Sequence, residues 1–487
     1  MTNMLLKNPK AYFQLLFFLI VIFLLRIFLW IYADLDLGFD EAQYWTWSKN
    51  LEWGYYSKPP FLAWLINSFT SICGNSEICI RISSPILHTI SAFFIALTAF
   101  NFSKKYSTGF IAASIWILVP GISLSSGFIS TDVPLLFFSS IVLWSFSCII
   151  LSNNNKLNYL IFCVALSLGF LSKYAIIYFI IALIIALIIE KEIFFKIKNK
   201  FSINNLFLII IGFFILIFNH LYWNYNNSFI TAQHTLANAN IDGAGNSFKN
   251  LFKFFFEQFL VFGPLTLIVL FASLYKYKKL SVEERILIFL TFTPLVLIMI
   301  QAFISRAHAN WAAIAYLPAT VLVALQIDRY WPKTKAIYYG IIAIGLCFTV
   351  LIPLTARHNL GLDPFKKYRG WSNIGLEISN IYLSYPEALL VTDDRRVMGE
   401  LLYYMKNKPK KWVRWNADGY IHDHYELVTK HNDLKNEIGI MVSSESNNKH
   451  FISSFKKVTF LKNIYRPISK ENNREYKVWL LEGYKDH

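Results

Sequence analysis

Long apolar runs occupy most of the first 355 residues, and they restrict the fold more than any other feature of this sequence. The first run, residues 11–32, is interrupted only by Gln14 and Arg26. A membrane helix needs about 20 mostly apolar residues, and a soluble core would not bury a chain that is 55% hydrophobic and 16% charged. We expect a polytopic all-α membrane domain of about eleven spans, at residues 11–32, 84–102, 108–128, 133–151, 157–171, 175–189, 203–223, 259–274, 285–303, 311–325 and 336–354.

Lysine and arginine residues alternate between the loops in a way that indicates the orientation of the chain in the membrane. If the N-terminus lies inside, the loops that hold most of the cations also lie inside, and the C-terminus lies outside. The net charge of +16 is explained by these loops, so we do not expect nucleic acid as a partner. The inside loops are those around residues 104–105, 156, 191–200, 276–279 and 329–335.

The chain divides into a membrane part and a polar C-terminal part. We expect residues 1–355 to form the membrane domain, with long outer segments at residues 34–83 and 224–258. Residues 356–487 are mixed and charged, and their patterns predict a small outer α/β domain. The predicted elements are strands at 387–391, 438–442 and 476–481 and a helix at 395–405.

The first outer segment carries the densest group of polar and aromatic residues. Asp40 and Glu41 follow the first apolar run and precede an aromatic stretch that includes Tyr56. Pro59-Pro60 then suits the start of a helix over residues 61–72, which places Lys58 at a helix N-terminus. The positive end of that helix would add to the charge of Lys58, so the sequence predicts a phosphate-binding position.

Other outer tips add a second acid and more cations. Asp132 lies between two apolar runs, and Lys173, Arg306, His308 and Asn310 lie on two further outer tips. Carboxylates and cations on one side of a membrane suggest group transfer at a phosphate-bearing substrate. One carboxylate would act on the attacking hydroxyl while the cations hold the departing phosphate.

Each of these residues also has a structural alternative. Asp40 and Glu41 would serve equally as helix caps, and Asp132 would cap the fourth span. Lys58 would pair with a lipid headgroup or with Glu52, and Lys173 would anchor the chain at the interface.

Two further features are expected to be structural. For Arg26 we favour pairing inside the protein over catalysis. Cys73 and Cys79 share the predicted outer side, where a disulfide is allowed, and the free-thiol alternative stays open.

Several short motifs occur together in an order that is typical of one family. The sequence resembles the GT-C membrane glycosyltransferases, and most closely their bacterial branch related to protein O-mannosyltransferases and to the aminoarabinose transferase of lipid A. Many relatives have Asp-His-Pro-Pro where this chain has Ser57-Lys58-Pro59-Pro60, which favours the aminoarabinose group. The matching motifs are Asp40-Glu41-Ala-Gln-Tyr44-Trp45, Gly54-Tyr55-Tyr56-Ser-Lys58-Pro59-Pro60, Ser130-Thr-Asp132-Val-Pro134, Leu171-Ser-Lys173-Tyr174, Trp223-Asn224, Ala309-Asn310-Trp311, Asp363-Pro-Phe-Lys-Lys-Tyr-Arg369-Gly370-Trp371 and Asp393-Asp-Arg-Arg.

The resemblance implies a GT-C-like fold in the bacterial inner membrane, with the C-terminal domain in the periplasm. It implies an inverting hexosyl- or pentosyltransferase that takes a sugar from a polyprenyl phosphate and needs no metal or cofactor. The acceptor would be lipid A or the lipopolysaccharide core. Asp40 and Asp132 match the catalytic acids of the family, and Lys58 matches its phosphate-binding lysine. We assign substrate binding to Glu41, Tyr56, Lys58, Lys173, Arg306, His308 and Asn310.

Three other functions compete with this one. A transporter of polyprenyl-linked sugars would place ionisable groups near the bilayer midplane, often within internal repeats, whereas here they gather in outer loops. A protein O-glycosyltransferase would differ only in its acceptor, and a structural protein would not need acids and cations on one face. The glycosyltransferase hypothesis predicts that Asp40, Lys58 and Asp132 line one outward cavity.

Overall fold

The computed structural model of the chain describes residues 8–151, 155–239, 247–358, 363–416, 418–444, 449–468 and 473–485. The chain forms two compact units. The first unit consists of Met1–Ile31, Lys58–Leu62 and Arg81–Pro353, and the second consists of Tyr32–Ser57, Ala63–Ile80 and Leu354–His487. Most of the first outer segment therefore folds with the C-terminal residues.

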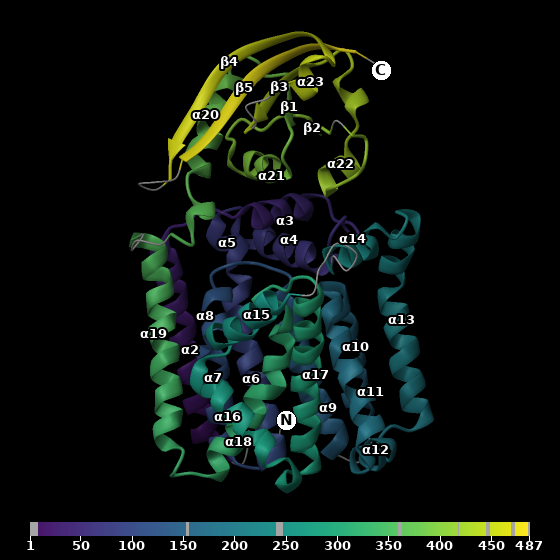
Figure 1. The fold of residues 1–487 in the computed structure, drawn as a ribbon, viewed down its shortest axis with the longest axis vertical. Coiled ribbons are helices and arrows are strands. Elements are labelled where there is room, and N and C mark those ends of the chain that lie inside the picture. The colour runs from purple at the N-terminus through teal and green to yellow at the C-terminus, as the bar shows by residue number, and fades with distance from the viewer. Residues whose placement is uncertain are drawn as a thin grey trace. The chain divides into compact units, whose positions relative to one another are not determined.

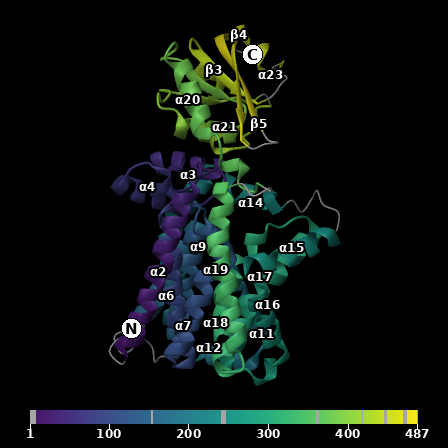
Figure 2. The same ribbon diagram turned by 90° about the vertical axis from the view of Figure 1, so that its left-hand side faces the viewer.

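The first unit is a helix bundle (Figures 1 and 2). Helices α6, α7, α9 and α10 pack against their neighbours in sequence, and α18 packs between α7 and α17. The described elements are α2 (Pro9–Ala33), α6 (Ser83–Ser103), α7 (Tyr106–Leu118), α8 (Pro120–Ser125), α9 (Asp132–Leu151), α10 (Lys156–Ser172), η1 (Tyr174–Ile176), α11 (Ile177–Ile189), α12 (Lys191–Lys198), α13 (Ile203–Asn226), α14 (Ile230–Ala239), α15 (Phe248–Val261), α16 (Pro264–Tyr275), η2 (Tyr277–Lys279), α17 (Val282–Ile304), η3 (Ala309–Ala315), α18 (Tyr316–Arg329) and α19 (Lys335–His358).

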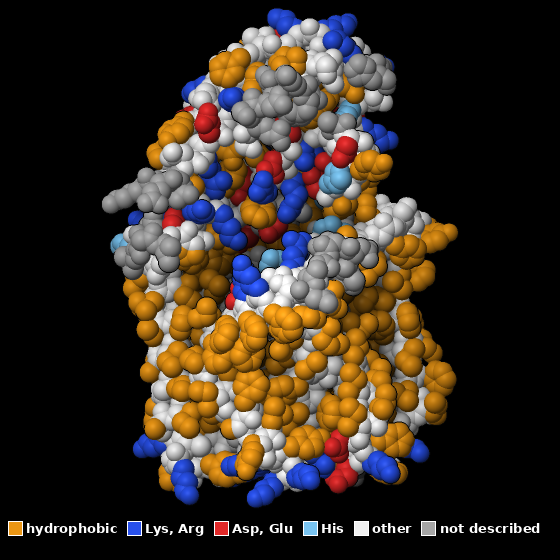
Figure 3. All heavy atoms as spheres, viewed as in Figure 1, with side chains coloured by type: hydrophobic (Ala, Val, Ile, Leu, Met, Phe, Trp, Pro, Cys, Tyr) orange, Lys and Arg blue, Asp and Glu red, His pale blue; other side chains and the backbone are white. Residues whose placement is uncertain are grey.

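Seven described helices are long and apolar enough to cross a membrane, and hydrophobic side chains cover the side of the bundle seen in Figure 3. An eighth span is possible if α15 and α16 count as one, although they bend by 110° at Gly263, whose φ of 91° few other residues adopt. The predicted apolar runs lie on helices, although the run at 108–128 is divided between α7 and α8 and the run at 259–274 between α15 and α16. The polytopic all-α class is confirmed. Helices α7, α10 and α11 are shorter than a full span, and the count of eleven stays a prediction.

The loops predicted to lie inside meet at one end of the bundle. Contacts join residues in or next to the α6–α7, α11–α12, α16–α17 and α18–α19 connections. This agrees with the prediction from the positive charges that these loops lie on one side of the membrane. These contacts are the Lys105 Nζ–Asp328 Oδ2 pair at 3.0 Å, the Arg285 Nη1–Glu190 Oε2 pair at 3.1 Å, and Lys276 Nζ above the Tyr330 ring at 3.8 Å.

Arg26 lies inside the first unit and is 1% exposed. Its guanidinium donates to Ser126 Oγ at 2.9 Å, to Ser123 Oγ at 3.1 Å and to the Ile117 carbonyl. These partners bind both terminal nitrogens of a charge that would otherwise be costly to bury, whereas Nε is buried without a hydrogen bond. The prediction of structural pairing for Arg26 is confirmed.

The second unit contains a five-stranded sheet in the order β2-β1-β3-β5-β4. Strand β1 is parallel to both of its neighbours, while β3, β5 and β4 are antiparallel. The described elements are α3 (Phe39–Lys49), α4 (Phe61–Cys73), α5 (Glu77–Arg81), η4 (Lys366–Tyr368), α20 (Trp371–Tyr382), β1 (Leu389–Thr392), α21 (Arg395–Tyr404), β2 (Trp412–Arg414), α22 (His424–Val428), η5 (His431–Leu434), β3 (Ile438–Ser443), α23 (Lys449–Ile452), β4 (Phe455–Pro467) and β5 (Asn473–Tyr484).

Both faces of this sheet are covered. Residues of α20 and α21, such as Ile374 and Leu401, pack with Leu390 on one face, and Trp415 and Phe451 pack on the other. The predicted α/β character, the three predicted strands and the helix at 395–405 are confirmed. Strands β2 and β4 were not predicted, because β2 is only three residues long and the exposed residues of the edge strand β4 interrupt its apolar pattern.

Residues of the first outer segment add helix α3 and most of helices α4 and α5 to the second unit. Helix α4 begins at Phe61, directly after Pro60, and confirms the predicted helix at 61–72. Helix α3 packs against α21 of the C-terminal domain. Cys73 and Cys79 form a disulfide between the end of α4 and α5, which resolves the alternative left open for them.

Candidate active site

The predicted site residues are distributed over both units. Lys58, Asp132, Lys173, Arg306, His308 and Asn310 belong to the first unit, whereas Asp40, Glu41 and Tyr56 belong to the second. The shared cavity of Asp40, Lys58 and Asp132 therefore stays a prediction.

Three connections of the first unit that are predicted to lie outside meet at Asp132. Asp132 is the first residue of α9 and is 8% exposed. Its Oδ1 accepts from Lys173 Nζ at 2.6 Å, and its Oδ2 accepts from Asn310 Nδ2 at 2.6 Å. Both oxygens of a nearly buried carboxylate are thus held by side chains from other tips, and such charge-assisted bonds are the strong ones. We call Asp132, Lys173 and Asn310 the Asp132 cluster.

The tip that carries Asn310 also carries two further predicted residues, Arg306 and His308. Burial lowers the pKa of His308, and the positive charges of Arg306, Lys253 and Lys173 lower it further, while Glu257 opposes them. His308 is therefore neutral at pH 7, and its environment is rich in cations. Arg306 is exposed and makes no hydrogen bond or ion pair with any other described residue, so its charge is available to an anionic ligand.

Lys253 was not among the predicted residues. It lies on α15, in the second outer segment, and pairs only loosely with Glu257 at 3.9 Å. The start of α15 is fixed to the tip because Ser247 N–H donates to the Phe303 carbonyl at 2.7 Å and Asn250 Nδ2 donates to the Ser305 carbonyl at 2.6 Å. Residues 240–246 of this segment lie outside the described residues. No motif in the sequence marks Lys253, since only the fold connects α15 to this tip.

Lys58 precedes the first residue of α4 by three positions and is half-buried. The following Pro59 and Pro60 are buried, which restricts the backbone next to Lys58. This local geometry fits the predicted place of a lysine ahead of a helix N-terminus, and its role in phosphate binding stays a prediction.

In the second unit the two adjacent acids of α3 have different surroundings. Glu41 is 3% exposed, and its Oε2 accepts from the Gly38 N–H at 3.0 Å at the N-terminus of α3. The Asp40 side chain is 51% exposed and lies 3.5 Å from Arg395 Nη1. The capping alternative therefore describes Glu41, whose substrate-binding role stays a prediction, and leaves Asp40 accessible.

Tyr56 contacts the C-terminal residues of its own unit. Its hydroxyl donates to the Ile421 carbonyl at 3.2 Å, and its backbone N–H approaches His424 Nδ1 at 3.5 Å. Burial raises the pKa of Tyr56, and the nearby Asp423 and Glu426 raise it further, so the phenol stays protonated and can donate.

Stability of the second unit is expected to fall in acid because of His424. Burial lowers the pKa of this imidazole to about 4, and the rings of Trp47 and Tyr55 pack edge-on against it. The pKa of histidine in an unfolded chain is about 6.5. Between pH 6.5 and pH 4 the unfolded chain therefore binds a proton that the folded chain does not bind. The free energy of unfolding consequently decreases as the pH falls through this range.

The free energy of unfolding should decrease by about 2 kcal/mol between pH 7 and pH 5. Thermal unfolding of the purified chain at the two pH values measures it, and His424→Gln should have a smaller pH dependence than the native protein. An equal pH dependence in the two proteins would show that His424 is not the titrating group.

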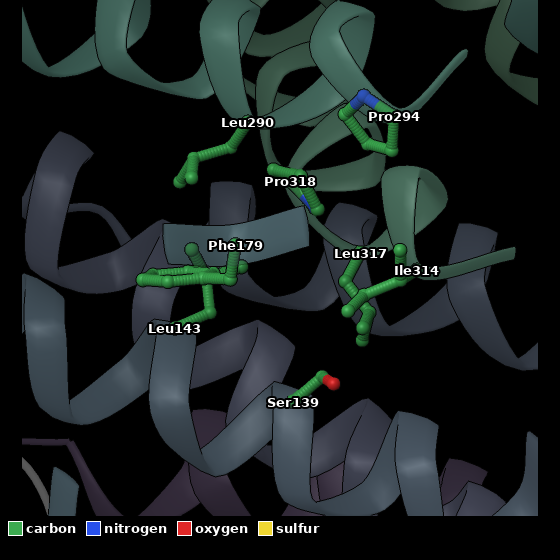
Figure 4. A pocket seen from close by; sticks show the side chains of 8 residues that line it. All are labelled: Ser139, Leu143, Phe179, Leu290, Pro294, Ile314, Leu317 and Pro318. Carbon is green, nitrogen blue, oxygen red and sulfur yellow. The ribbon is translucent and has the colours of Figure 1, made fainter. Parts of the chain in front are cut away.

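Two further features of the described residues bear on the site: candidate metal ligands and a cavity. The described part of the chain contains no group of three or more His, Cys, Asp or Glu residues close enough to hold a metal ion. The small cavity in Figure 4 lies inside the bundle and contains none of the predicted residues. Its lining is apolar apart from Ser139, and comprises Ser139, Leu143, Phe179, Leu290, Pro294, Ile314, Leu317 and Pro318.

Comparison with known proteins gives an independent view of the chain. Residues 57–223 match the family described as dolichyl-phosphate-mannose-protein mannosyltransferase. The lipid A galacturonosyltransferase RgtD of Rhizobium johnstonii is 29% identical over 400 residues, which cover 80% of this chain and 82% of that protein.

Solved structures of ArnT from Cupriavidus metallidurans share the fold. The apo structure has a TM-score of 0.64 at 13% identity and covers 96% of this chain and 99% of ArnT. The structure bound to undecaprenyl phosphate has a TM-score of 0.65 at 14% identity, with coverage of 95% and 97%. The chain is thus similar in sequence to a lipid A galacturonosyltransferase over most of its length, and it is a multi-pass membrane protein with the fold of ArnT.

Proposed function

We propose that this chain is an inverting glycosyltransferase that moves a galacturonosyl residue from a polyprenyl phosphate to lipid A, on the periplasmic side of the bacterial inner membrane. Similarity to the lipid A galacturonosyltransferase RgtD over 80% of the chain supports both the sugar and the acceptor. The fold shared with ArnT, which was solved with undecaprenyl phosphate bound, supports a polyprenyl carrier. The N-terminus would then be cytoplasmic and the C-terminal domain periplasmic.

The observation that carries this proposal is the concentration of charge around the Asp132 cluster. Lys173 is paired with Asp132, while Arg306 has no partner among the described residues and Lys253 is only loosely paired. The proposed reactants are all anions: the carrier phosphate, the carboxylate of galacturonic acid and the phosphates of lipid A. One unpaired and one loosely paired cation near a fixed carboxylate suit such reactants.

The reaction needs one bond to form as another breaks. The acceptor oxygen bonds to the anomeric carbon of the sugar, the bond from that carbon to the phosphate oxygen breaks, and polyprenyl phosphate leaves with the electron pair. Lys58, Lys173 and Arg306 offset the charge on the departing phosphate, and Asp132 holds Lys173 in place.

Asp40 orients the acceptor. When the acceptor is a hydroxyl, Asp40 also takes its proton as general base. A lipid A phosphate oxygen is already ionised and needs no base, so Asp40 then acts by positioning alone.

The proposal is tested by mass spectrometry of lipid A from cells with and without this protein. We expect one hexuronic acid to disappear from lipid A when the protein is removed. Purified protein in detergent should also transfer galacturonic acid from undecaprenyl phosphate galacturonic acid to lipid A, and release undecaprenyl phosphate.

Other results would change or refute the assignment. Loss of an aminopentose instead of a hexuronic acid would change the sugar, and an unchanged lipid A with a missing glycan on periplasmic protein would change the acceptor. Donor that crosses the membrane of a vesicle without being consumed would refute transfer and favour a transporter.

A further inference from the structure

Helices α3 and α21 approach each other closely enough for side chains to interlock. Asp40 and Gln43 are three residues apart on α3, and Arg395 and Gly399 are four residues apart on α21, so each pair lies on one face of its helix. A Cβ added at Gly399 would lie 3.3 Å from the Gln43 backbone nitrogen and 2.8 Å from the Tyr425 hydroxyl. Glycine at this position thus permits the close contact between the two helices.

At this contact Arg395 reaches two residues of α3. Its Nη1 donates to Gln43 Oε1 at 2.7 Å and lies 3.5 Å from Asp40 Oδ1. Gln43 is 3% exposed, so its amide is fixed, and the Arg395 guanidinium also lies 5.5 Å from the centre of the Phe39 ring. Gln43 and Phe39 of α3 therefore fix the position of the guanidinium next to the Asp40 carboxylate.

The neighbouring Arg396 has a different role. Asp394 caps α21 by accepting from the Arg396 N–H at 2.8 Å, and the same carboxylate pairs with the Arg396 guanidinium at 2.7 Å. The two consecutive arginines of the Asp393-Asp-Arg-Arg motif thus have different partners. Arg396 binds the capping residue Asp394, and Arg395 binds residues of α3.

The Asp40–Arg395 pair is too exposed to stabilise the fold strongly. The two side chains are 51% and 38% exposed, and ion pairs of this kind typically contribute about 0–1 kcal/mol. The consequence of the contact is therefore local: it limits the directions in which the Asp40 carboxylate can point.

We infer that Arg395 is a positioning residue for Asp40, supplied to the transfer reaction by the C-terminal domain. This inference rests on the proposed function, in which Asp40 orients the acceptor. It gives the C-terminal domain a direct part in catalysis, because removing the guanidinium releases the Asp40 carboxylate from its fixed direction. Misplacement of a reacting group by about 1 Å typically costs about 10²-fold in rate.

The test compares Arg395→Gln with the matched control Arg396→Gln in the full-length purified protein. The substrates are undecaprenyl phosphate galacturonic acid and lipid A. We expect Arg395→Gln to lower kcat about 10-fold to 100-fold with the donor KM and Tm unchanged, and Arg396→Gln to keep the native kcat. Arg395→Lys keeps the charge but not the forked geometry, so it should recover part of the lost rate.

A double variant separates positioning from a general structural effect. If Arg395 acts through Asp40, Arg395→Gln should cause no further loss when Asp40 is already Asn. A native kcat in Arg395→Gln, a raised donor KM with normal kcat, or an additive loss in the double variant would each overturn the inference. If Asp40→Asn itself transferred sugar at the native rate, the role of Asp40 would be wrong while the transferase function stood. If the native protein transferred no sugar, the proposed function itself would fail, so the failures are distinguishable.

Discussion

Replacing Asp40 with asparagine is expected to lower the rate of sugar transfer by about 10²–10³-fold while the chain remains folded. Asparagine keeps the shape of the side chain but removes the charge that orients the acceptor and, for a hydroxyl acceptor, the base that takes its proton. The side chain is half exposed and its ion pair is exposed as well, so Tm should change little. Initial rates and thermal unfolding of the same preparation measure both quantities.

The first outer segment offers a matched control for this substitution. Asp34 is also an exposed carboxylate paired with an arginine, Arg357, at 2.8 Å. Asp34→Asn should therefore keep the native rate, since it loses the same kind of ion pair without touching α3. Near-native transfer by Asp40→Asn, or an equal loss in both variants, would remove Asp40 from the catalytic role.

The Asp132 cluster shows how far sequence reasoning reaches in a membrane protein. Spans alternate in direction, so a polar tip between two apolar runs must lie on a predictable side. Asp132 is 41 residues from Lys173 and 178 residues from Asn310 in the sequence. The order of the apolar runs nevertheless predicts that all three lie on the same side of the membrane. Their actual hydrogen bonds did not follow, because alternation of spans gives a side and not a neighbour.

Contacts made by the C-terminal domain were beyond such reasoning. Arg395 and Gln43 are 352 residues apart, and no periodic pattern relates α3 to α21. The two acids of α3 were equally ambiguous in the sequence, since a capping carboxylate and a catalytic one have the same local signature. Only the fold buries Glu41 against Gly38 and leaves Asp40 exposed.

Replacing Asp132 with asparagine is expected to weaken both the fold and the reaction. The Asp132 and Lys173 side chains are 11% and 21% exposed, so loss of the carboxylate leaves a mostly buried ammonium without its counter-charge. Breaking a buried pair from one side typically costs 3–5 kcal/mol, and the partial exposure of Lys173 places the expected cost near about 3 kcal/mol. The transfer rate should fall by about 10²-fold, because Lys173 is no longer held toward the departing phosphate.

A charge-neutral double variant separates these two effects. In Asp132→Asn combined with Lys173→Gln, no unpaired charge is buried, so the free energy of unfolding should return close to its native value. The transfer rate should stay low, because the lysine that offsets the phosphate charge is absent. Asp328→Asn is the control: its partner Lys105 is 61% exposed, so a similar pair is lost at little cost. A double variant that recovered the native rate together with stability would show that the Asp132–Lys173 pair only supports the fold, since a group that stabilises the transition state cannot be removed without lowering the rate.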